Sequence, residues 1–314
     1  MMENAAPQNL HEGITLVTPS APIATATHGG RAKCLQRLVR LDLPVPTTIA
    51  LSFQAVSQIA AGQAPDIAAL LKPFGEDPLL CVRPSSEDPD WGGPGAILNI
   101  GMNEARFAEL SNSMGDEPAA AMYLRFVQSY AIHVARLDAD VFDEIDEDGV
   151  AGLKRTLHAY EDETDEVFPE DRGEQLIGVL RSMARAWDGT SARLLRQAKG
   201  APADAGLGLV IQEMIPGVGQ GECGSGVLQL VDPTTGMPQI TGRYLSQSQG
   251  RDALGEDVSA LYLEKDPRGP SLEEVAPSAF ADLKAQAALM REKLREEMQV
   301  EFVIQNGNVH ILDG

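Results

Sequence analysis

Hydrophobic and polar positions change period along the chain, and these changes divide it into three parts. In the first part, apolar residues at helical spacing predict a helix over 31–41. Apolar runs at 48–51 and 79–83 lie next to prolines and are typical of buried strands. The first part is therefore expected to mix helices with strands.

From about residue 103 to residue 199 the pattern becomes helical. Apolar residues between 119 and 134 lie near helical spacing, and further helices are predicted over 175–187 and 192–199. The tract 138–171 carries fourteen acidic residues against two basic ones, a composition typical of a solvated face.

The last part returns to strands and adds one long helix, predicted over 278–298. Apolar runs at 300–304 and 309–312 flank Asn306 and Gly307. An Asn-Gly pair between two such runs predicts a β-hairpin with a type I′ turn.

Glycines gather in the stretch 208–255. An apolar strand is predicted at 209–215, and the loop 217–226 that follows it has five glycines in ten residues. A second apolar run at 227–231 completes the expected hairpin. Glycine-rich loops bring backbone amides close to anions, and they also form the mobile tips of β-hairpins. Composition leaves both interpretations open.

Charge and composition narrow the class of protein. The formal net charge is −21 and the isoelectric point is about 4.5, which argues against nucleic acid as the main partner. A nucleotide remains compatible, because a few local cations suffice to bind its phosphates. The N-terminus does not resemble a signal peptide, and no apolar run approaches the ~20 residues of a membrane span, so no membrane partner is expected.

The cysteines and histidines favour a reducing compartment. Cys34, Cys81 and Cys223 are too widely spaced for a zinc site or a disulfide framework. The five histidines show no metal-ligand spacing either. We therefore expect a cytoplasmic protein.

Three charged residues stand beside apolar strands or at a helix start. Arg83 ends a buried strand, where an arginine either caps the surface or forks around a phosphate. Glu301 is either an edge-strand carboxylate or a Mg²⁺ ligand beside a nucleotide phosphate. Arg31 follows Gly29 and Gly30 at a helix start, which suits an anion but is also common for a surface arginine. Neither a P-loop nor a dinucleotide fingerprint is present.

Taken in order, these pieces resemble a known family. Residues 29–46 are similar to the pattern G-G-K-G-A-N-L…L-P-V-P, and residues 82–103 to V-R-S…P-G-M…L-N-L-G-L-N. Segments between 212 and 250 resemble Q-x-M-V, S-G-T-G-V, N-P-x-T-G and A-Q-G, and residues 300–312 resemble I-E-F…L-Q. These motifs belong to the N-terminal ATP-grasp (PEP/pyruvate-binding) domain of the pyruvate phosphate dikinase and phosphoenolpyruvate synthase family. The resemblance covers about 28–314.

The resemblance implies an α/β (α+β) ATP-grasp fold, with two α/β lobes around a nucleotide cleft and a helical subdomain inserted between them. The expected boundaries are a flexible lead-in over 1–27, an N-terminal lobe over 28–102, the helical subdomain over 103–200 and a C-terminal lobe over 201–314.

The family's activity implies the cofactors and partners. A kinase of this type is expected to use ATP and Mg²⁺ and to pass a phosphoryl group to a histidine on a separate domain. The family's T-S-H phosphohistidine motif is absent, and the chain ends at Gly314. The histidine domain is therefore expected in trans or in a longer polypeptide, and a homodimer stays open.

Site residues carry over position by position. The resemblance assigns phosphate binding and catalysis to Arg83 and Arg31, adenine and phosphate binding to Gln212, Glu213, Met214, Ile215, Gly224, Ser225 and Gly226, and metal binding to Glu301 and Asp313. Asp313 stands where the family has glutamine.

Five further positions depart from the family pattern. Arg31 replaces a lysine, Gln299 an acid, Arg243 and Arg251 glutamates, and Val231 an arginine. Lysine to arginine keeps the charge but changes its geometry. Phosphoryl transfer depends on positioning and on metal that neutralises developing charge, so the lost carboxylates threaten catalysis more than binding. The alternative hypothesis is a catalytically degenerate nucleotide-binding or interaction module of the same fold.

Overall fold

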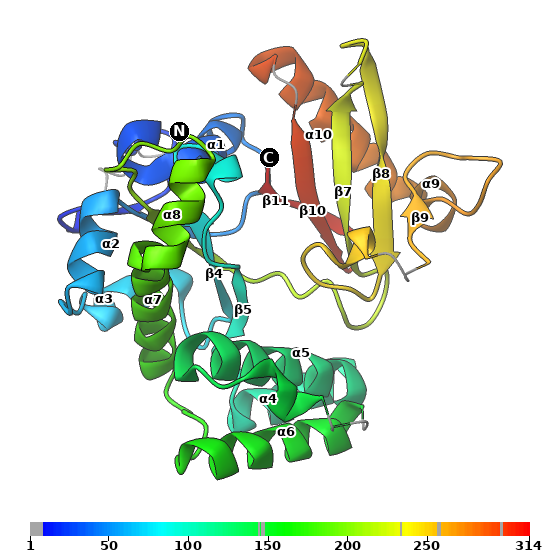
Figure 1. The fold of residues 1–314 in the computed structure, drawn as a ribbon. Helices are drawn as coiled ribbons and strands as arrows, with labels where there is room; N and C mark the ends of the chain where they lie inside the picture. The colour runs from blue at the N-terminus through cyan, green and yellow to red at the C-terminus, as the bar shows by residue number, and fades with distance from the viewer. Residues whose placement is uncertain (1–8, 144, 146–147, 233, 256–258, 296–297) are drawn as a thin grey trace. The chain divides into compact units, whose positions relative to one another are not determined.

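The computed structural model describes residues 9–143, 145, 148–232, 234–255, 259–295 and 298–314. It contains helices and two antiparallel sheets, which confirms the expected α+β class (Figure 1). The chain forms two compact units. The first unit contains Met1–Gln36 and Thr47–Met214, and the second contains Arg37–Pro46 and Ile215–Gly314.

A six-stranded sheet forms the centre of the first unit. Its order is β1 (Asn9–His11), β2 (Ile14–Leu16), β3 (Thr48–Leu51), β6 (Gly208–Glu213), β4 (Leu80–Ser85) and β5 (Ile97–Ile100). Neighbouring strands are antiparallel throughout. The central strands β3, β6 and β4 are buried on nearly every residue, because helices cover the sheet. This explains why they appear in the sequence as unbroken apolar runs.

Strand β6 corrects one prediction. Residues 209–215 were expected to form a hairpin with 227–231, but β6 pairs with β3 on one side and β4 on the other. The second run lies in the other sheet. Local sequence favoured a hairpin, but pairing with two strands satisfies both edges of β6, and α2 packs against the same strand.

The helices of the first unit are α1 (Thr25–Arg40, which ends in the second unit), α2 (Phe53–Ala60), α3 (Ile67–Leu71), α4 (Glu104–Met114), α5 (Asp116–Tyr130), α6 (Gly149–Thr164), α7 (Arg172–Asp188) and α8 (Thr190–Ala198). Four of them, α1, α5, α7 and α8, lie where helices were predicted, near 31–41, 119–134, 175–187 and 192–199. Side-chain caps fix several starts: Asn103 accepts from the Arg106 amide at 2.8 Å, and Asp171 from the Glu174 amide at 2.8 Å. Helices α2 and α7 pack against the sheet, and α4, α5 and α6 pack side by side (Figure 1).

An aromatic cluster joins α5 and α6 to the segment 165–171. The ring of Phe168 lies 5.2–6.0 Å from the rings of Tyr123, Phe126, Tyr130 and Tyr160, each in an edge-to-face arrangement. Such pairs stabilise by ~0.5–1.5 kcal/mol each beyond the buried area. The cluster therefore fixes the link between α6 and α7 against α5.

A five-stranded antiparallel sheet forms the second unit. Its order is β11 (Asn308–Asp313), β10 (Gln299–Gln305), β7 (Gly224–Val231), β8 (Pro238–Ser246) and β9 (Leu261–Tyr262). Helix α10 (Pro277–Leu294) follows α9 (Leu272–Val275) and lies along one face of the sheet (Figure 1).

The predicted C-terminal hairpin is confirmed. Strands β10 and β11 pair up to Gln305 and Asn308, which leaves Asn306 and Gly307 as a two-residue turn. Both turn residues have positive φ, 51° and 78°, as a type I′ turn requires. Among the residues that the structure describes, no helix is both long and apolar enough to cross a membrane.

Candidate functional site

The Gly29–Gly30–Arg31 segment lies against the end of β4. Gly29 has φ 85° and ψ 170°, so α1 is interrupted there. A side chain at Gly29 would place its Cβ 1.9 Å from the Ser85 carbonyl oxygen. The Gly30 amide donates to the Ser86 carbonyl at 2.7 Å. The glycine is therefore required by its backbone conformation and by the close approach of the strand.

Ser85 fixes the restart of the helix. Its hydroxyl accepts from the Ala32 amide at 3.0 Å and donates to the His28 carbonyl at 2.7 Å. Burial lowers the pKa of His28, so its imidazole is held neutral. The two hydrogen bonds of the Ser85 hydroxyl hold the start of the helix against β4.

Both predicted catalytic arginines belong to this junction. Arg31 donates from Nη1 to the carbonyl oxygen of Pro84, the residue that follows Arg83. Arg83 is 6% exposed and lies opposite Val210 on β6. The fold thus concentrates two permanent positive charges near the end of one strand, an arrangement that suits an anionic group.

The predicted adenine hinge is only partly available for a ligand. The Gln212 side chain is buried and donates to Thr48 Oγ1 at 3.1 Å. The amide of Glu213 donates to the Thr47 carbonyl at 2.9 Å, and that of Met214 to the Leu79 carbonyl at 2.8 Å. The chain passes from the first unit to the second between Met214 and Ile215. Adenine recognition at this hinge stays a prediction.

Gly224, Ser225 and Gly226 belong to strand β7, although the sequence placed them in a loop. Added Cβ atoms would lie 2.4 Å from the Tyr244 hydroxyl at Gly224 and 2.5 Å from the Phe302 ring at Gly226. The rings of Tyr244 and Phe302 stack across this strand, with centroids 6.2 Å apart. Core packing therefore explains these glycines without any ligand, and their role in phosphate binding stays a prediction.

Ser225 is fully buried between the glycines. Its hydroxyl lies 2.7 Å from the Ser248 hydroxyl, which also accepts from the Ser225 amide at 3.2 Å. The side chain is thus already bonded within the second unit.

The remaining glycine loop, 217–223, is tied to its surroundings. The amide of Gly217 donates to Gln305 Oε1 at 2.8 Å, and that of Gly219 to Gln247 Oε1 at 2.9 Å. Two amides that could face an anion are therefore bonded to glutamine side chains. These bonds favour an anchored loop over the mobile hairpin tip.

Glu222 adds a further anchor to the loop. Its carboxylate accepts from the Tyr244 hydroxyl at 2.7 Å and from the Ser246 hydroxyl at 3.3 Å. Burial, with a further contribution from Glu222, raises the pKa of Tyr244 far above its usual value. Tyr244 therefore remains a hydrogen-bond donor at any physiological pH.

Two predicted metal ligands come together on the five-stranded sheet. Glu301 on β10 lies directly opposite Asp313 on β11. The register shifts by one residue between this pair and the next, Phe302 with Ile311, so a β-bulge lies beside the two acidic residues. Asp313 is 6% exposed and the Glu301 side chain 12% exposed, so both are well shielded from solvent.

The same register brings a departure from the family pattern onto this face. Val227 on β7 pairs with Glu301, and Arg243 on β8 pairs with Val227. A row of paired residues therefore crosses the sheet from Asp313 and Glu301 through Val227 to Arg243. Its guanidinium lies 4.1 Å from the centroid of the Tyr262 ring and donates to the Ala260 carbonyl at 3.4 Å.

Arg251 contacts the carboxylate side of the row. Its Nε lies 3.3 Å from Glu301 Oε1, and its Nη2 donates to Gln299 Oε1 at 2.7 Å. Two positions that depart from the family pattern, 251 and 299, are thus bonded to each other, and Arg251 also contacts a predicted metal ligand. Strand alternation alone could have placed Gln299 beside Glu301, but no sequence signal could have brought Arg251 there.

The oxygen ligands present fit a hard divalent cation in part. Mg²⁺ is commonly held by one or two protein carboxylates, with water and phosphate oxygens completing its shell. Glu301 and Asp313 supply that number of carboxylates. In the described ranges of the chain, no group of three or more histidine, cysteine or acidic side chains is placed to hold a metal by itself. A nucleotide's phosphates would have to supply further ligands.

The fold and these residues define an α+β domain with an ATP-grasp-like arrangement of elements. No protein-family model matches the chain. The pyruvate, phosphate dikinase of Rhizobium meliloti (strain 1021) is 26% identical over 326 residues, and that of Clostridium symbiosum is 27% identical over 321 residues. Each match covers 90% of this chain and 36% of the relative. Pyruvate, phosphate dikinase 2 of Oryza sativa subsp. japonica is 25% identical, with 90% and 35% covered.

These similarities confirm the resemblance found in the sequence. They support membership of the pyruvate, phosphate dikinase family, in its N-terminal ATP-grasp region. The chain spans about a third of the length of these curated relatives. The activities of the full-length relatives are therefore only proposed for this chain.

Proposed function

We propose that the chain is the ATP-binding domain of a dikinase-like phosphotransferase, which passes a phosphoryl group from Mg-ATP to a histidine on a separate domain. The observation that carries this proposal is the pairing of Glu301 with Asp313 on adjacent strands. Two neighbouring carboxylates are a common protein contribution to a Mg²⁺ ion bound with phosphates. The similarity to pyruvate, phosphate dikinases supports the same conclusion.

Each charged group has a distinct role in this proposal. Arg83 and Arg31 bind phosphate oxygens, because guanidinium groups match their geometry and stay charged. Glu301 and Asp313 hold the cation, which supplies neutralising charge when it is bound. The rigid junction between Gly29 and Ser85 limits the movement of Arg31, which favours a preorganised phosphate site.

A second candidate, a degenerate nucleotide-binding module, is favoured by one specific contact. The guanidinium of Arg251 lies against Glu301 and neutralises part of the charge that a metal ion needs. A fixed cation in this position weakens metal binding by Coulomb repulsion. The arginine also occupies an oxygen of Glu301 that could otherwise hold the metal ion, which neutralises the charge that develops during phosphoryl transfer. Such a domain would bind nucleotide without completing the reaction.

Phosphotransfer separates the two candidates. The chain is incubated with Mg²⁺, uniformly phosphate-labelled ATP and the histidine domain of a pyruvate, phosphate dikinase added as a separate polypeptide. Acid-labile label on that domain, absent without the chain, supports the phosphotransferase. Nucleotide binding without label supports the degenerate module. If neither nucleotide binding nor label on the histidine domain is observed, both candidates are contradicted.

A further inference from the structure

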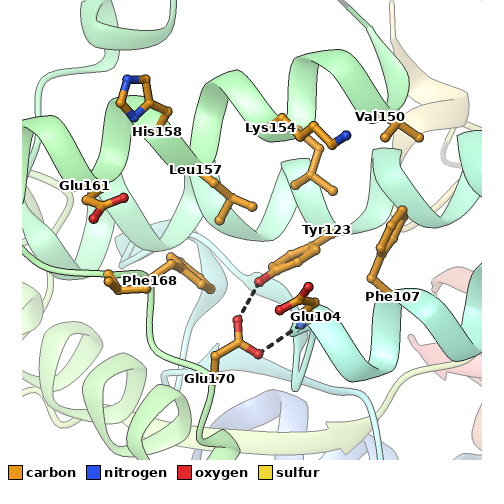
Figure 2. Close-up of a pocket in the computed structure, with 12 residues that line it drawn as sticks. Glu104, Phe107, Tyr123, Val150, Lys154, Leu157, His158, Glu161, Phe168 and Glu170 are labelled. Carbon is orange, nitrogen blue, oxygen red and sulfur yellow. Dashed lines mark hydrogen bonds between the residues drawn. The ribbon is translucent and has the colours of Figure 1, made fainter.

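A cavity of about 430 Å³ lies within the first unit, among α4, α5, α6 and the segment 165–171. Its volume falls within the ~300–1,000 Å³ typical of small-molecule sites. Its walls are built from side chains of these elements, with Tyr123 at the centre and α6 above it (Figure 2). None of the residues assigned to nucleotide binding lines it.

The cavity walls are mostly aromatic and aliphatic. The ring of Tyr123 lies 6.4 Å from that of Phe107 and 6.0 Å from that of Phe168. Leu157 on α6 points toward these rings (Figure 2), and Leu153 of the same helix also lines the cavity. The aromatic cluster around Phe168 fixes this wall of the cavity.

One carboxylate of the cavity lining, that of Glu170, is held by two hydrogen bonds. Glu170 accepts from the Tyr123 hydroxyl at 3.3 Å and from the Glu104 amide at 2.9 Å (Figure 2). Burial and then Glu170 raise the pKa of Tyr123 well above its usual value, so its hydroxyl stays a donor. A carboxylate has about four acceptor positions, so Glu170 can accept further bonds from a ligand.

The other charges around the opening are mainly negative. The side chains of Glu104 and Glu161 also line the cavity, together with Lys154 and His158. His158 lies 3.4 Å from Asp162, one turn further along α6. Three carboxylates against one lysine give the lining an excess of negative charge. Aromatic faces beside these carboxylates also attract cations.

We propose that this cavity is a binding site for a small organic amine, an ammonium group carried on an apolar body. The ammonium group bonds to Glu170 and is attracted by Glu104 and Glu161, and the apolar body packs on Phe107, Tyr123 and Phe168. Each part of such a ligand meets a matching part of the cavity. The site is independent of the proposed nucleotide function, and neither result bears on the other.

Three probes of one size test the ligand's charge. The whole chain is titrated by calorimetry with 2-phenylethylamine (a cation at neutral pH), 2-phenylethanol (neutral) and 3-phenylpropionate (an anion). The amine is expected to bind at least ~10-fold more tightly than either analogue, a factor that corresponds to one charge-assisted hydrogen bond. Equal affinity for all three, tighter binding of the anion, or no binding of the amine would overturn the proposal.

Variants locate the binding in this cavity. The double substitution Glu104→Gln and Glu161→Gln removes two charges whose side chains are exposed, and it is expected to weaken amine binding ~10-fold. Glu109→Gln with Glu163→Gln changes two exposed glutamates of the same helices that do not line the cavity, and it should leave the affinity unchanged.

A third variant tests the volume without altering any charge. Val150→Trp adds bulk at the cavity wall and should abolish binding of the amine, while thermal melting confirms that the variant is folded. Unchanged amine affinity in folded Val150→Trp or in the Glu104/Glu161 double variant would place the amine elsewhere and overturn the proposal.

Discussion

The guanidinium Nε of Arg251 lies 3.3 Å from Oε1 of Glu301, the carboxylate that pairs across the sheet with Asp313. The Arg251 side chain is 55% exposed, so this ion pair contributes only ~0.2–1 kcal/mol. Even so, it places a permanent positive charge on the predicted metal ligand. We therefore expect Arg251 to weaken metal binding at Glu301.

Substituting Arg251→Gln should strengthen Mg²⁺ binding in the presence of ATP. Removing the guanidinium removes its repulsion of the cation, and we expect a ~2- to 5-fold lower dissociation constant for Mg²⁺. Calorimetric titration of Mg²⁺ at saturating ATP measures it. Arg268→Gln is the matched control, because Arg268 pairs with Asp266 in the same unit. Equal Mg²⁺ affinity in wild type and Arg251→Gln would show that Arg251 does not act on the metal.

Substituting Gly29→Ala should destabilise the chain strongly. The added Cβ would lie 1.9 Å from the Ser85 carbonyl oxygen, at a φ of 85°. We expect the free energy of unfolding to fall by about 3 kcal/mol or more, as seen for strained backbone positions with a clash. Gly62→Ala is the control, since Gly62 has φ 97° but nothing within 4 Å of its added Cβ. A similar loss in both variants, measured by urea unfolding, would mean that the contact with β4 contributes nothing.

Substituting Tyr244→Phe should loosen the anchored glycine loop. The change removes the donor that holds Glu222 and leaves a part-buried carboxylate with one fewer partner, at a cost of ~1–3 kcal/mol. Ser246→Ala removes the longer, exposed bond to the same carboxylate and should cost less than ~1 kcal/mol. Thermal unfolding measures stability, and amide hydrogen exchange over 217–223 reports the loop. Unchanged exchange in Tyr244→Phe would contradict the anchoring role of this bond.

His28 gives the first unit a pH dependence of defined sign. Burial lowers its pKa below the usual 6.5, so the unfolded chain takes up this proton at a higher pH than the folded chain does. Between the lowered pKa and 6.5 the unfolded state binds more protons, so stability falls as the pH falls through this window. In His28→Asn the contribution of this imidazole to the pH dependence of stability is absent.

Urea unfolding at about pH 8 and about pH 5.5 measures the effect. The loss of stability on acidification should be smaller in His28→Asn than in wild type, because carboxylates titrate alike in both. An equal loss would show that His28 does not titrate differently in the two states.

Much of the fold could be predicted from the sequence because local patterns decided it. The Asn306-Gly307 pair specified its hairpin, since both residues adopt the positive φ that the turn requires. A strand was predicted at 209–215 and forms at 208–213, but its predicted hairpin with 227–231 was wrong, because a strand buried on both faces carries no period that points to one neighbour. The boundaries drawn at 102 and 200 stay predictions.

The candidate site was predictable residue by residue but not in its connections. Glu301 and Asp313 were chosen separately, and only the strand register shows that their backbones pair on adjacent strands. Gly224 and Gly226 look like a phosphate loop in the sequence, but the rings of Tyr244 and Phe302 account for both. Contacts between distant segments of a chain depend on tertiary packing, which local composition does not encode.

The central proposal, nucleotide binding, is tested most directly by calorimetric titration of the folded wild-type chain with ATP in the presence of Mg²⁺. We expect saturable binding at one site, with a dissociation constant of roughly 1 mM or tighter. Removing Mg²⁺ with a chelator should weaken that binding, because Glu301 and Asp313 would then face the phosphates without a cation between them. The absence of any saturable heat of binding, with or without Mg²⁺, would contradict the proposal.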